Sequence, residues 1–240
     1  MRQSDLRPFK GTAWRFVEDQ NTSSTMKLVS SVADQETLEH LLDDSKPAVP
    51  AACRHLHYLL FTPFRYRARS ATRFRRKGER LGVFYAAESV EVCGAEMAFY
   101  RLLFFLESPD TTPTQRPFEM TAFKVGLAAT RSVRLAEAVP PTEMASYTDP
   151  VEYSACYRFV DDARKEAAEI IEYPSVRSPG GTNYAVLDCA VFEPTRPIDL
   201  QGWWFRITKD RVFAQRRFGV ESMEFAFEDF ASDPRIAERL

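Results

Sequence analysis

The segment from Arg65 to Leu103 constrains the fold most, because a basic loop, a short apolar strand and a long apolar helix follow one another without a break. Half of the sixteen positions from 65 to 80 are Arg or Lys, and Glu79 is the one acidic residue among them. The run Val83-Phe84-Tyr85-Ala86-Ala87 then has the length and composition of a buried strand.

A helix is predicted to begin directly after Ser89, which stands where an N-cap belongs. In the apolar pattern that follows, Val92, Glu96, Phe99 and Leu103 fall on one helical face. A carboxylate on the stripe that faces the core is unfavourable unless a cation or a ligand pairs with it. We therefore predict that Glu96 belongs to a site for an anionic ligand that acquires positive charge.

The positive charge of the chain is local. Eight of the 32 basic residues lie in 65–80 but only one of the 34 acidic residues does, so the rest of the chain is acidic although the net charge is −2. We consider three interpretations of the basic loop: a solvated surface loop, a nucleic-acid patch, and a pocket for a small phosphorylated ligand. The aromatic residues within it are few for base stacking, so we expect no direct nucleic-acid binding.

The remaining patterns predict one α+β domain over residues 1–240, with mixed or antiparallel sheets flanked by helices. A register slip is expected near Ala122 and Phe123, and Asp149 should cap a helix that runs to about Ala168. The expected strands cover 13–17, 83–87, 118–127, 133–135, 170–174 and 184–192, with a hairpin at 203–208 and 212–216, and the other helices cover 34–42 and the segment after Ser89.

Cysteine and histidine spacing favours neither a disulfide framework nor a metal site. The four cysteines lie far apart without a CxxC pair, and the three histidines lie at 40, 55 and 57. This spacing indicates a reducing compartment. With no apolar leader and no run long enough to span a membrane, a cytoplasmic location is expected.

Three other residues have open interpretations. Arg15, in the strand-like run 13–17, is either an inward arginine or a strand-end arginine whose head reaches water. Tyr85 is either a core residue or a stacking platform. Ser175 lacks a GxSxG context and a nearby histidine base, so a ligand-positioning serine fits better than a nucleophile.

Several separated motifs together resemble the RES-domain proteins, a family named for an arginine, a glutamate and a serine. The resemblance spans roughly residues 13 to 192 and leaves a C-terminal hairpin extension at 200–240. Its motifs are Trp14-Arg15-Phe16-Val17-Glu18-x-Gln20, Pro63-Phe64-Arg65-Tyr66, Thr72-Arg73-Phe74-Arg75, Val83-Phe84-Tyr85, Ala95-Glu96 and Tyr173-Pro174-Ser175-Val176-Arg177 through Asn183. Phe16 departs from the tyrosine that compact members often have.

The resemblance implies a fold similar to ADP-ribosyltransferase toxins and an enzyme that destroys NAD. It also implies a toxin–antitoxin pair in which a cognate antitoxin with an Xre-like DNA-binding region restrains the toxin. Carried over by motif, the catalytic residues are Glu96, Ser175 and Arg15 or Arg73. Tyr85 would line the nicotinamide side, and Asn183 would be a polar residue of the same pocket.

We therefore expect an NAD glycohydrolase or phosphorylase without a prosthetic group or metal, with NAD as substrate and inorganic phosphate as a candidate co-substrate. Glu96 would face the positive charge that develops when the nicotinamide–ribose bond breaks, and Arg15 and Arg73 would hold the pyrophosphate. The alternatives are a protein ADP-ribosyltransferase that uses the same pocket and a non-enzymatic binding module that uses the basic loop. A homodimer is a candidate assembly, and the acceptor is left open.

Overall fold

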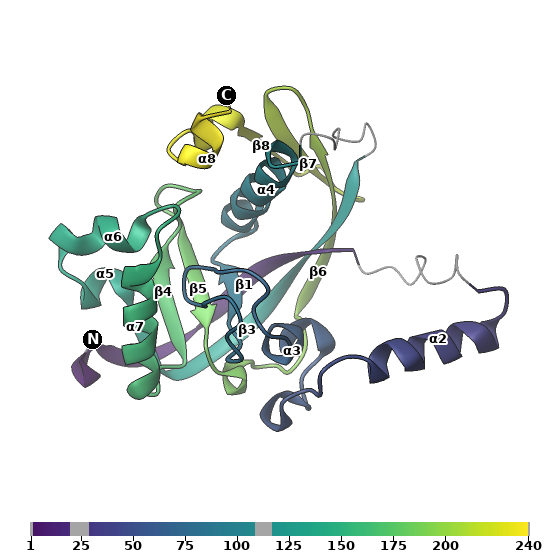
Figure 1. Cartoon of the computed structure of the whole chain (residues 1–240), viewed down its shortest axis with the longest axis horizontal. Coiled ribbons are helices and arrows are strands. Elements are labelled where there is room, and N and C mark those ends of the chain that lie inside the picture. The colour runs from purple at the N-terminus through teal and green to yellow at the C-terminus, as the bar shows by residue number, and fades with distance from the viewer. Residues whose placement is uncertain (1, 20–28, 109–116, 240) are drawn as a thin grey trace.

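The computed structural model describes residues 2–19, 29–108 and 117–239 (Figure 1). Its centre is one mixed eight-stranded sheet in the order β1-β2-β5-β4-β3-β6-β7-β8, and β1 also pairs with β3. Strands β1, β2, β5, β4 and β3 therefore form a closed ring, from which β6, β7 and β8 continue. The strands are β1 (Leu6–Glu18), β2 (Phe84–Ala87), β3 (Phe118–Arg134), β4 (Ile170–Pro174), β5 (Thr182–Val186), β6 (Asp199–Ile207), β7 (Arg211–Arg216) and β8 (Ser222–Ala226).

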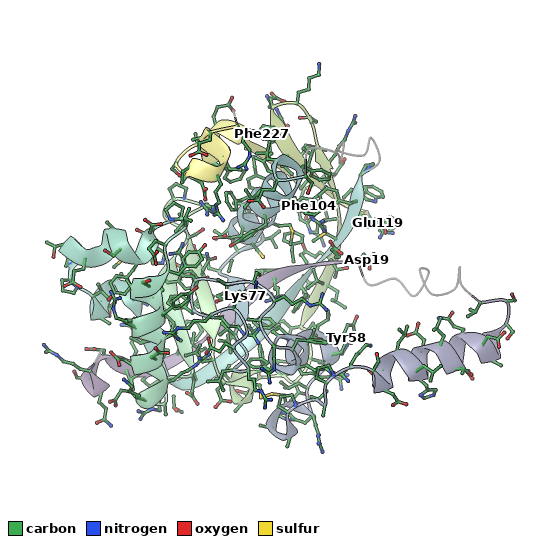
Figure 2. All side chains as sticks on the ribbon, in the orientation of Figure 1. Asp19, Tyr58, Lys77, Phe104, Glu119 and Phe227 are labelled. Carbon is green, nitrogen blue, oxygen red and sulfur yellow. A yellow bond between two sulfur atoms is a disulfide. The ribbon has the colours of Figure 1, made fainter. Side chains whose placement is uncertain are left out.

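Helices lie around this sheet, and the mixture of helices and strands confirms the predicted α+β class. Figure 1 shows α2 projecting away from the body, and Figure 2 shows its side chains standing clear of the other elements. The α-helices are α2 (Val32–Asp44), α3 (Tyr58–Arg65), α4 (Val90–Leu106), α5 (Leu135–Ala138), α6 (Met144–Thr148), α7 (Ser154–Lys165) and α8 (Pro234–Ala237). The 3-10 turns are η1 (Gln3–Asp5), η2 (Ala51–Cys53), η3 (Pro141–Glu143), η4 (Cys189–Val191) and η5 (Phe227–Phe230).

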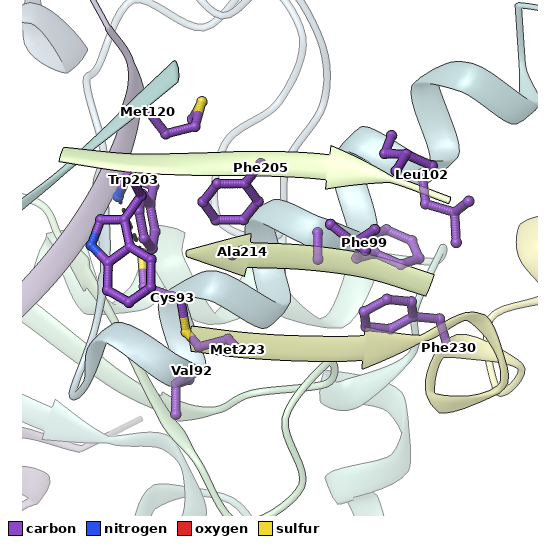
Figure 3. Packing of buried hydrophobic residues seen from close by; sticks show 14 of the residues in the cluster. Val92, Cys93, Phe99, Leu102, Met120, Trp203, Phe205, Ala214, Met223 and Phe230 are labelled. Atoms are coloured by element: carbon purple, nitrogen blue, oxygen red, sulfur yellow. Dashed lines mark hydrogen bonds between the residues drawn. The ribbon is translucent and has the colours of Figure 1, made fainter. Parts of the chain in front are cut away.

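Helix α4 is the element that the sequence pattern predicts best. The Ser89 hydroxyl accepts a hydrogen bond from the backbone N–H of Val92 at 3.2 Å, as an N-cap should. Val92, Phe99 and Leu103 are buried, and Glu96 on the same stripe is partly buried. Figure 3 shows side chains of α4 packed onto β6, β7 and β8, with Phe99 next to Phe230. The helix is thereby fixed against the sheet extension.

The slip predicted near Ala122 and Phe123 is wrong. Strand β3 pairs with β1 in unbroken register there, and the register shifts instead between Arg7 and Phe9. Both residues are fully buried because β3 is covered on both faces, Ala122 by the cluster around α4 and Phe123 by a second core cluster. A strand buried on both sides does not show the alternation on which the prediction relied.

The ends of several other helices and strands also differ from those that the sequence predicted. The Asp149 carboxylate accepts hydrogen bonds from the N–H groups of Val151 and Glu152, at 2.8 and 2.7 Å, but the helix begins only at Ser154. The predicted strand 184–192 ends at Val186, and the expected strands 118–127 and 133–135 are one continuous strand. The hairpin of β6 and β7 is confirmed, and β8 adds a strand that was not predicted. Gln20 of the first motif lies outside the described residues.

The prediction that the chain has no disulfide is also wrong. Cys53 in η2 and Cys189 in η4 are bonded, and they are 136 positions apart in the chain. The folding of η2 against η4 brings them together, which spacing along the chain cannot show. The spacing argument for a reducing compartment therefore fails. Within the described ranges, the helices are all too short or too polar to cross a membrane.

Candidate functional site

A cavity of about 250 Å³ opens between α4, the closed strand ring and the turn that contains Thr72 and Arg73. Its lining is aromatic and apolar with a few convergent polar groups, which is typical of a small-molecule site. The lining residues are Arg15, Phe16, Thr72, Arg73, Tyr85, Ala86, Ala87, Cys93, Glu96, Met97, Tyr100, Tyr153, Tyr173, Val176 and Asn183. Five of the six residues predicted for the site are among them, and Ser175 contacts one of the five.

Glu96 is held from two sides through a single oxygen. Its Oε1 accepts a hydrogen bond from Ser175 Oγ at 2.9 Å and another from Asn183 Nδ2 at 2.7 Å. Its Oε2 accepts no hydrogen bond from the described residues. Two donors on one oxygen fix the carboxylate in place and leave the other oxygen for a ligand.

Ser175 lies in the connection between β4 and β5, which folds into a tight turn. The Ser175 hydroxyl accepts hydrogen bonds from the N–H groups of Arg177 and Ser178, at 3.2 and 3.1 Å, and donates its own proton to Glu96. Gly181 closes the turn by accepting from Ser175 N at 2.8 Å. A Cβ at Gly181 would lie 2.7 Å from Val92 of α4, so a larger residue would push the turn away from the helix.

Asn183 is placed by the sheet. It lies on β5, opposite Ala87 of β2 on one side and Tyr173 of β4 on the other. It is buried, with an exposed fraction of 4%. A buried amide needs partners for its N–H groups, and Glu96 supplies one.

Arg15 lies inward, so the strand-end interpretation is wrong. It extends from β1, its Nη1 donates to the backbone carbonyl of Tyr85 at 2.7 Å, and its guanidinium lies 4.9 Å from the centre of the Phe84 ring. The buried Nε has no hydrogen-bond partner among the described residues. Burial lowers the pKa of the Arg15 guanidinium from its ordinary value, but an arginine in a protein stays charged.

Arg73 is the member of the basic loop that lines the cavity. Its Nη1 donates to the carbonyl of Tyr147 at 2.6 Å, and its guanidinium lies 5.1 Å from the centre of the Tyr153 ring. Within the described parts of the chain, neither Arg73 nor Arg15 forms an ion pair with a carboxylate. The cavity therefore has two guanidinium charges that no carboxylate of the described residues pairs with.

Tyr85 lines the cavity and also supports the fold, while its role as a stacking platform stays a prediction. The Tyr85 hydroxyl lies 2.9 Å from Thr72 Oγ1 and accepts a hydrogen bond from Phe74 N at 3.0 Å. These bonds hold the turn that carries Arg73. Burial raises the pKa of Tyr85 to about 12, so its hydroxyl remains protonated at neutral pH.

The lining also includes residues that the sequence did not single out. Met97 and Tyr100 follow Glu96 on α4, and the helical period alone would have placed Tyr100 beside Glu96. Tyr153 comes from the segment before α7, and no local pattern marks it. Burial raises the pKa of the Cys93 thiol to about 12, so this lining cysteine is neutral and not a thiolate nucleophile.

Most of the basic loop serves the fold or faces solvent. Arg65 pairs with Asp43 at 3.2 Å, and Arg76 makes two hydrogen bonds to Asp161 at 2.9 and 2.7 Å. Arg75 donates to the carbonyls of Tyr66 and Glu79. The exposed basic residues are Arg67, Arg69, Lys77 and Arg80.

Comparison with known proteins places most of this site inside one family model. The RES domain model matches residues 49–208, which include every predicted site residue except Arg15. No curated protein matches the chain. A solved structure, the M. tuberculosis MbcT–MbcA toxin–antitoxin complex, is similar at 12% identity and a TM-score of 0.44, over 97% of this chain and 92% of that chain. On the family match, the chain belongs to the RES-domain family.

Proposed function

We propose that this cavity binds NAD and that the protein cleaves the bond between nicotinamide and ribose. The observation that carries the proposal is the state of Glu96: Ser175 and Asn183 hold its Oε1, and its Oε2 accepts no hydrogen bond from the described residues. A fixed carboxylate beside a cavity is suited to a reacting atom that becomes positively charged.

The chemistry follows from that carboxylate. As the glycosidic bond breaks, its electron pair moves to the ring nitrogen of nicotinamide, which leaves as a neutral molecule and needs no proton. The ribose carbon and its ring oxygen then share a positive charge, which Glu96 stabilises. Water or phosphate adds to that carbon, and an attacking water loses its extra proton to the solvent.

The two arginines supply the charge that an anionic substrate needs. Arg15 and Arg73 line the same cavity, and among the described residues neither has a carboxylate partner, so either guanidinium can contact a phosphate oxygen. The cavity volume of about 250 Å³ is below the about 300–1,000 Å³ of typical ligand pockets. The nicotinamide riboside half of NAD would be enclosed, and the adenosine half would extend outside.

Membership of the RES-domain family supports the wider role. On that basis we propose that the protein is the toxin of a toxin–antitoxin pair, that its fold is related to ADP-ribosyltransferases, and that an antitoxin with an Xre-like DNA-binding region restrains it. Coexpression with the neighbouring gene product should relieve toxicity in a bacterial host. Unchanged toxicity in that coexpression would contradict the proposed pairing.

The direct test is to incubate the purified protein with NAD and to follow nicotinamide by chromatography, with Glu96→Gln as the inactive comparison. Free ADP-ribose would show that water attacked, and ADP-ribose phosphate formed only with added phosphate would show a phosphorylase. A labelled protein would show ADP-ribose transfer instead. If no nicotinamide is released above the Glu96→Gln background, with or without phosphate, the proposed activity is wrong.

A further inference from the structure

The C-terminal segment from Phe227 to Arg239 packs against α4, the helix that carries Glu96, although the RES domain match ends at residue 208. It contains η5 and α8, and Figure 1 shows α8 beside one end of α4. Phe230 and Ile236 belong to the core cluster of α4, with exposed fractions of 1% and 0%. The segment is therefore part of the packed body of the protein.

A buried ion pair joins this segment to the turn that carries Ser175. Arg177 Nη2 lies 2.7 Å from Asp233 Oδ2, and the two side chains are 3% and 0% exposed. Arg235 also binds the Asp233 carboxylate, at 2.7 Å and 2.9 Å. A buried charge that loses its partner is strongly destabilising, so each residue of the pair restricts where the other can lie.

Hydrogen bonds connect this ion pair to Glu96 through the backbone of Arg177. The N–H of Arg177 donates to Ser175 Oγ at 3.2 Å, and that hydroxyl in turn donates to Glu96 Oε1 at 2.9 Å. The position of Arg177 therefore determines whether its N–H can orient the hydroxyl. Asp233 does not line the cavity, so its effect on the site is indirect, and this chain of contacts is the most direct route to Glu96.

The Arg177 side chain also contacts α4 directly. Its guanidinium lies 3.6 Å from the centre of the Phe99 ring, and Phe99 is three residues after Glu96 on the same helix. Arg235 lies over the same ring at 5.3 Å and donates to the Pro150 carbonyl at 3.1 Å. The turn, the helix that carries Glu96 and the C-terminal segment thus meet at one buried point.

We propose that Asp233 and Arg177 are a positioning pair that orients Ser175 toward Glu96, so that the C-terminal segment completes the active site. The proposal rests on the proposed function for its kinetic test, but the geometry can be tested without activity. Neither residue touches the cavity, and their effect should pass through Ser175.

The kinetic test is a double-mutant cycle with Asp233→Asn and Ser175→Ala. Loss of a hydrogen bond to a charged group lowers kcat about 10- to 100-fold, which we expect for Ser175→Ala. Asp233→Asn should lower kcat about tenfold or more with the KM for NAD changed less than about threefold. The double variant should be no more than about twofold slower than Ser175→Ala, because both act through one hydroxyl. If the loss of kcat in the double variant equals the product of the losses in the two single variants, the two residues act independently and the proposal is wrong.

The test without activity is hydrogen exchange of the peptide that covers residues 175–181. In Asp233→Asn these amides should exchange about tenfold faster than in the wild type. The matched control is Asp161→Asn, which breaks the ion pair with Arg76 and should leave this peptide unchanged. Unchanged exchange in a folded Asp233→Asn variant would overturn the positioning role. Wild-type protein that releases no nicotinamide would overturn only the proposed function.

If Asp233→Asn does not fold, Arg235→Gln gives the second test. This change weakens the hold on the Asp233 carboxylate but leaves the Arg177–Asp233 pair intact, and Arg235 is partly exposed. Exchange at 175–181 should rise about two- to fivefold, a smaller effect in the same direction. No change at these amides in folded Arg235→Gln would count against the proposal.

Discussion

Ser175 Oγ lies 2.9 Å from Glu96 Oε1, although 79 positions separate the two residues in the chain. This contact joins the turn between β4 and β5 to helix α4, and Asn183 adds a second donor to the same oxygen at 2.7 Å. The carboxylate is therefore oriented before any substrate binds. Preorganised charge of this kind makes a large contribution to enzymatic catalysis.

The first prediction concerns the charge of Glu96. Glu96→Gln keeps the shape and removes the charge, so kcat for NAD cleavage should fall about 100- to 1,000-fold. The melting temperature should change little, because the side chain is only partly buried. Nicotinamide release measures the rate, and thermal unfolding measures the stability.

Glu91→Gln is the matched control for that variant. Glu91 is exposed in the first turn of α4 and lies outside the cavity lining, so its loss should leave kcat within about twofold of the wild type. Near-normal cleavage by Glu96→Gln would show that this carboxylate is not the catalytic one.

Local sequence patterns predicted one side of the site well. The Ser89 cap and the stripe of Val92, Glu96, Phe99 and Leu103 are all within one helix, where spacing alone determines which residues share a face. The short apolar strand before α4 was likewise confirmed as β2. The inward carboxylate could therefore be identified without any knowledge of the partners that hold it.

The other side of the site depends on contacts between distant segments. Asn183 was named only through the family resemblance, the sequence context of Ser175 indicated a ligand-positioning role without a partner, and no pattern marked Tyr153 or Asp233. The closing of the ring by β1 and β3, and the bond between Cys53 and Cys189, also join residues more than a hundred positions apart. Periodicity describes one element at a time, so it cannot show which elements meet.

The second prediction separates Arg73 from its basic neighbours. Arg73 lines the cavity, whereas Arg69 and Lys77 are exposed and lie outside the lining. A charged hydrogen bond to phosphate contributes about 1.5–3 kcal/mol, so Arg73→Ala should raise the KM for NAD about ten- to a hundredfold. Arg69→Ala and Lys77→Ala should each change it less than about threefold.

The lysine variant makes the Arg73 test sharper. Arg73→Lys keeps the charge but loses the planar fork that can bind the Tyr147 carbonyl and a phosphate together. We expect it to resemble Arg73→Ala in KM more than the wild type. A fully active lysine variant would show that only the positive charge of Arg73 matters. Equal increases in KM for alanine variants at positions 69, 73 and 77 would indicate that the whole basic loop acts as a diffuse positive field.

The third prediction concerns DNA. Arg65, Arg75 and Arg76 are engaged within the protein, which leaves four exposed basic residues in the loop for phosphate contacts. We expect no more than weak duplex binding at about 0.15 M salt. Fluorescence anisotropy over a salt series measures this, and tight binding that weakens steeply as salt rises would favour the nucleic-acid interpretation of residues 65–80.

The last prediction uses the raised pKa of Tyr85. At neutral pH, Tyr85→Phe should be destabilised by about 1–3 kcal/mol, because the turn at Thr72 and Phe74 loses two hydrogen bonds. The folded pKa of about 12 lies above the ordinary value of 10.0, so the wild-type contribution is fully present below pH 10. It is lost as the pH rises through 10 to 12, whereas phenylalanine does not titrate. Denaturant unfolding of both proteins should therefore show a stability gap that is constant from pH 7 to 9 and narrows above pH 10. A gap that stays constant or widens above pH 10 would show that the Tyr85 hydroxyl is not held in its protonated form by the fold.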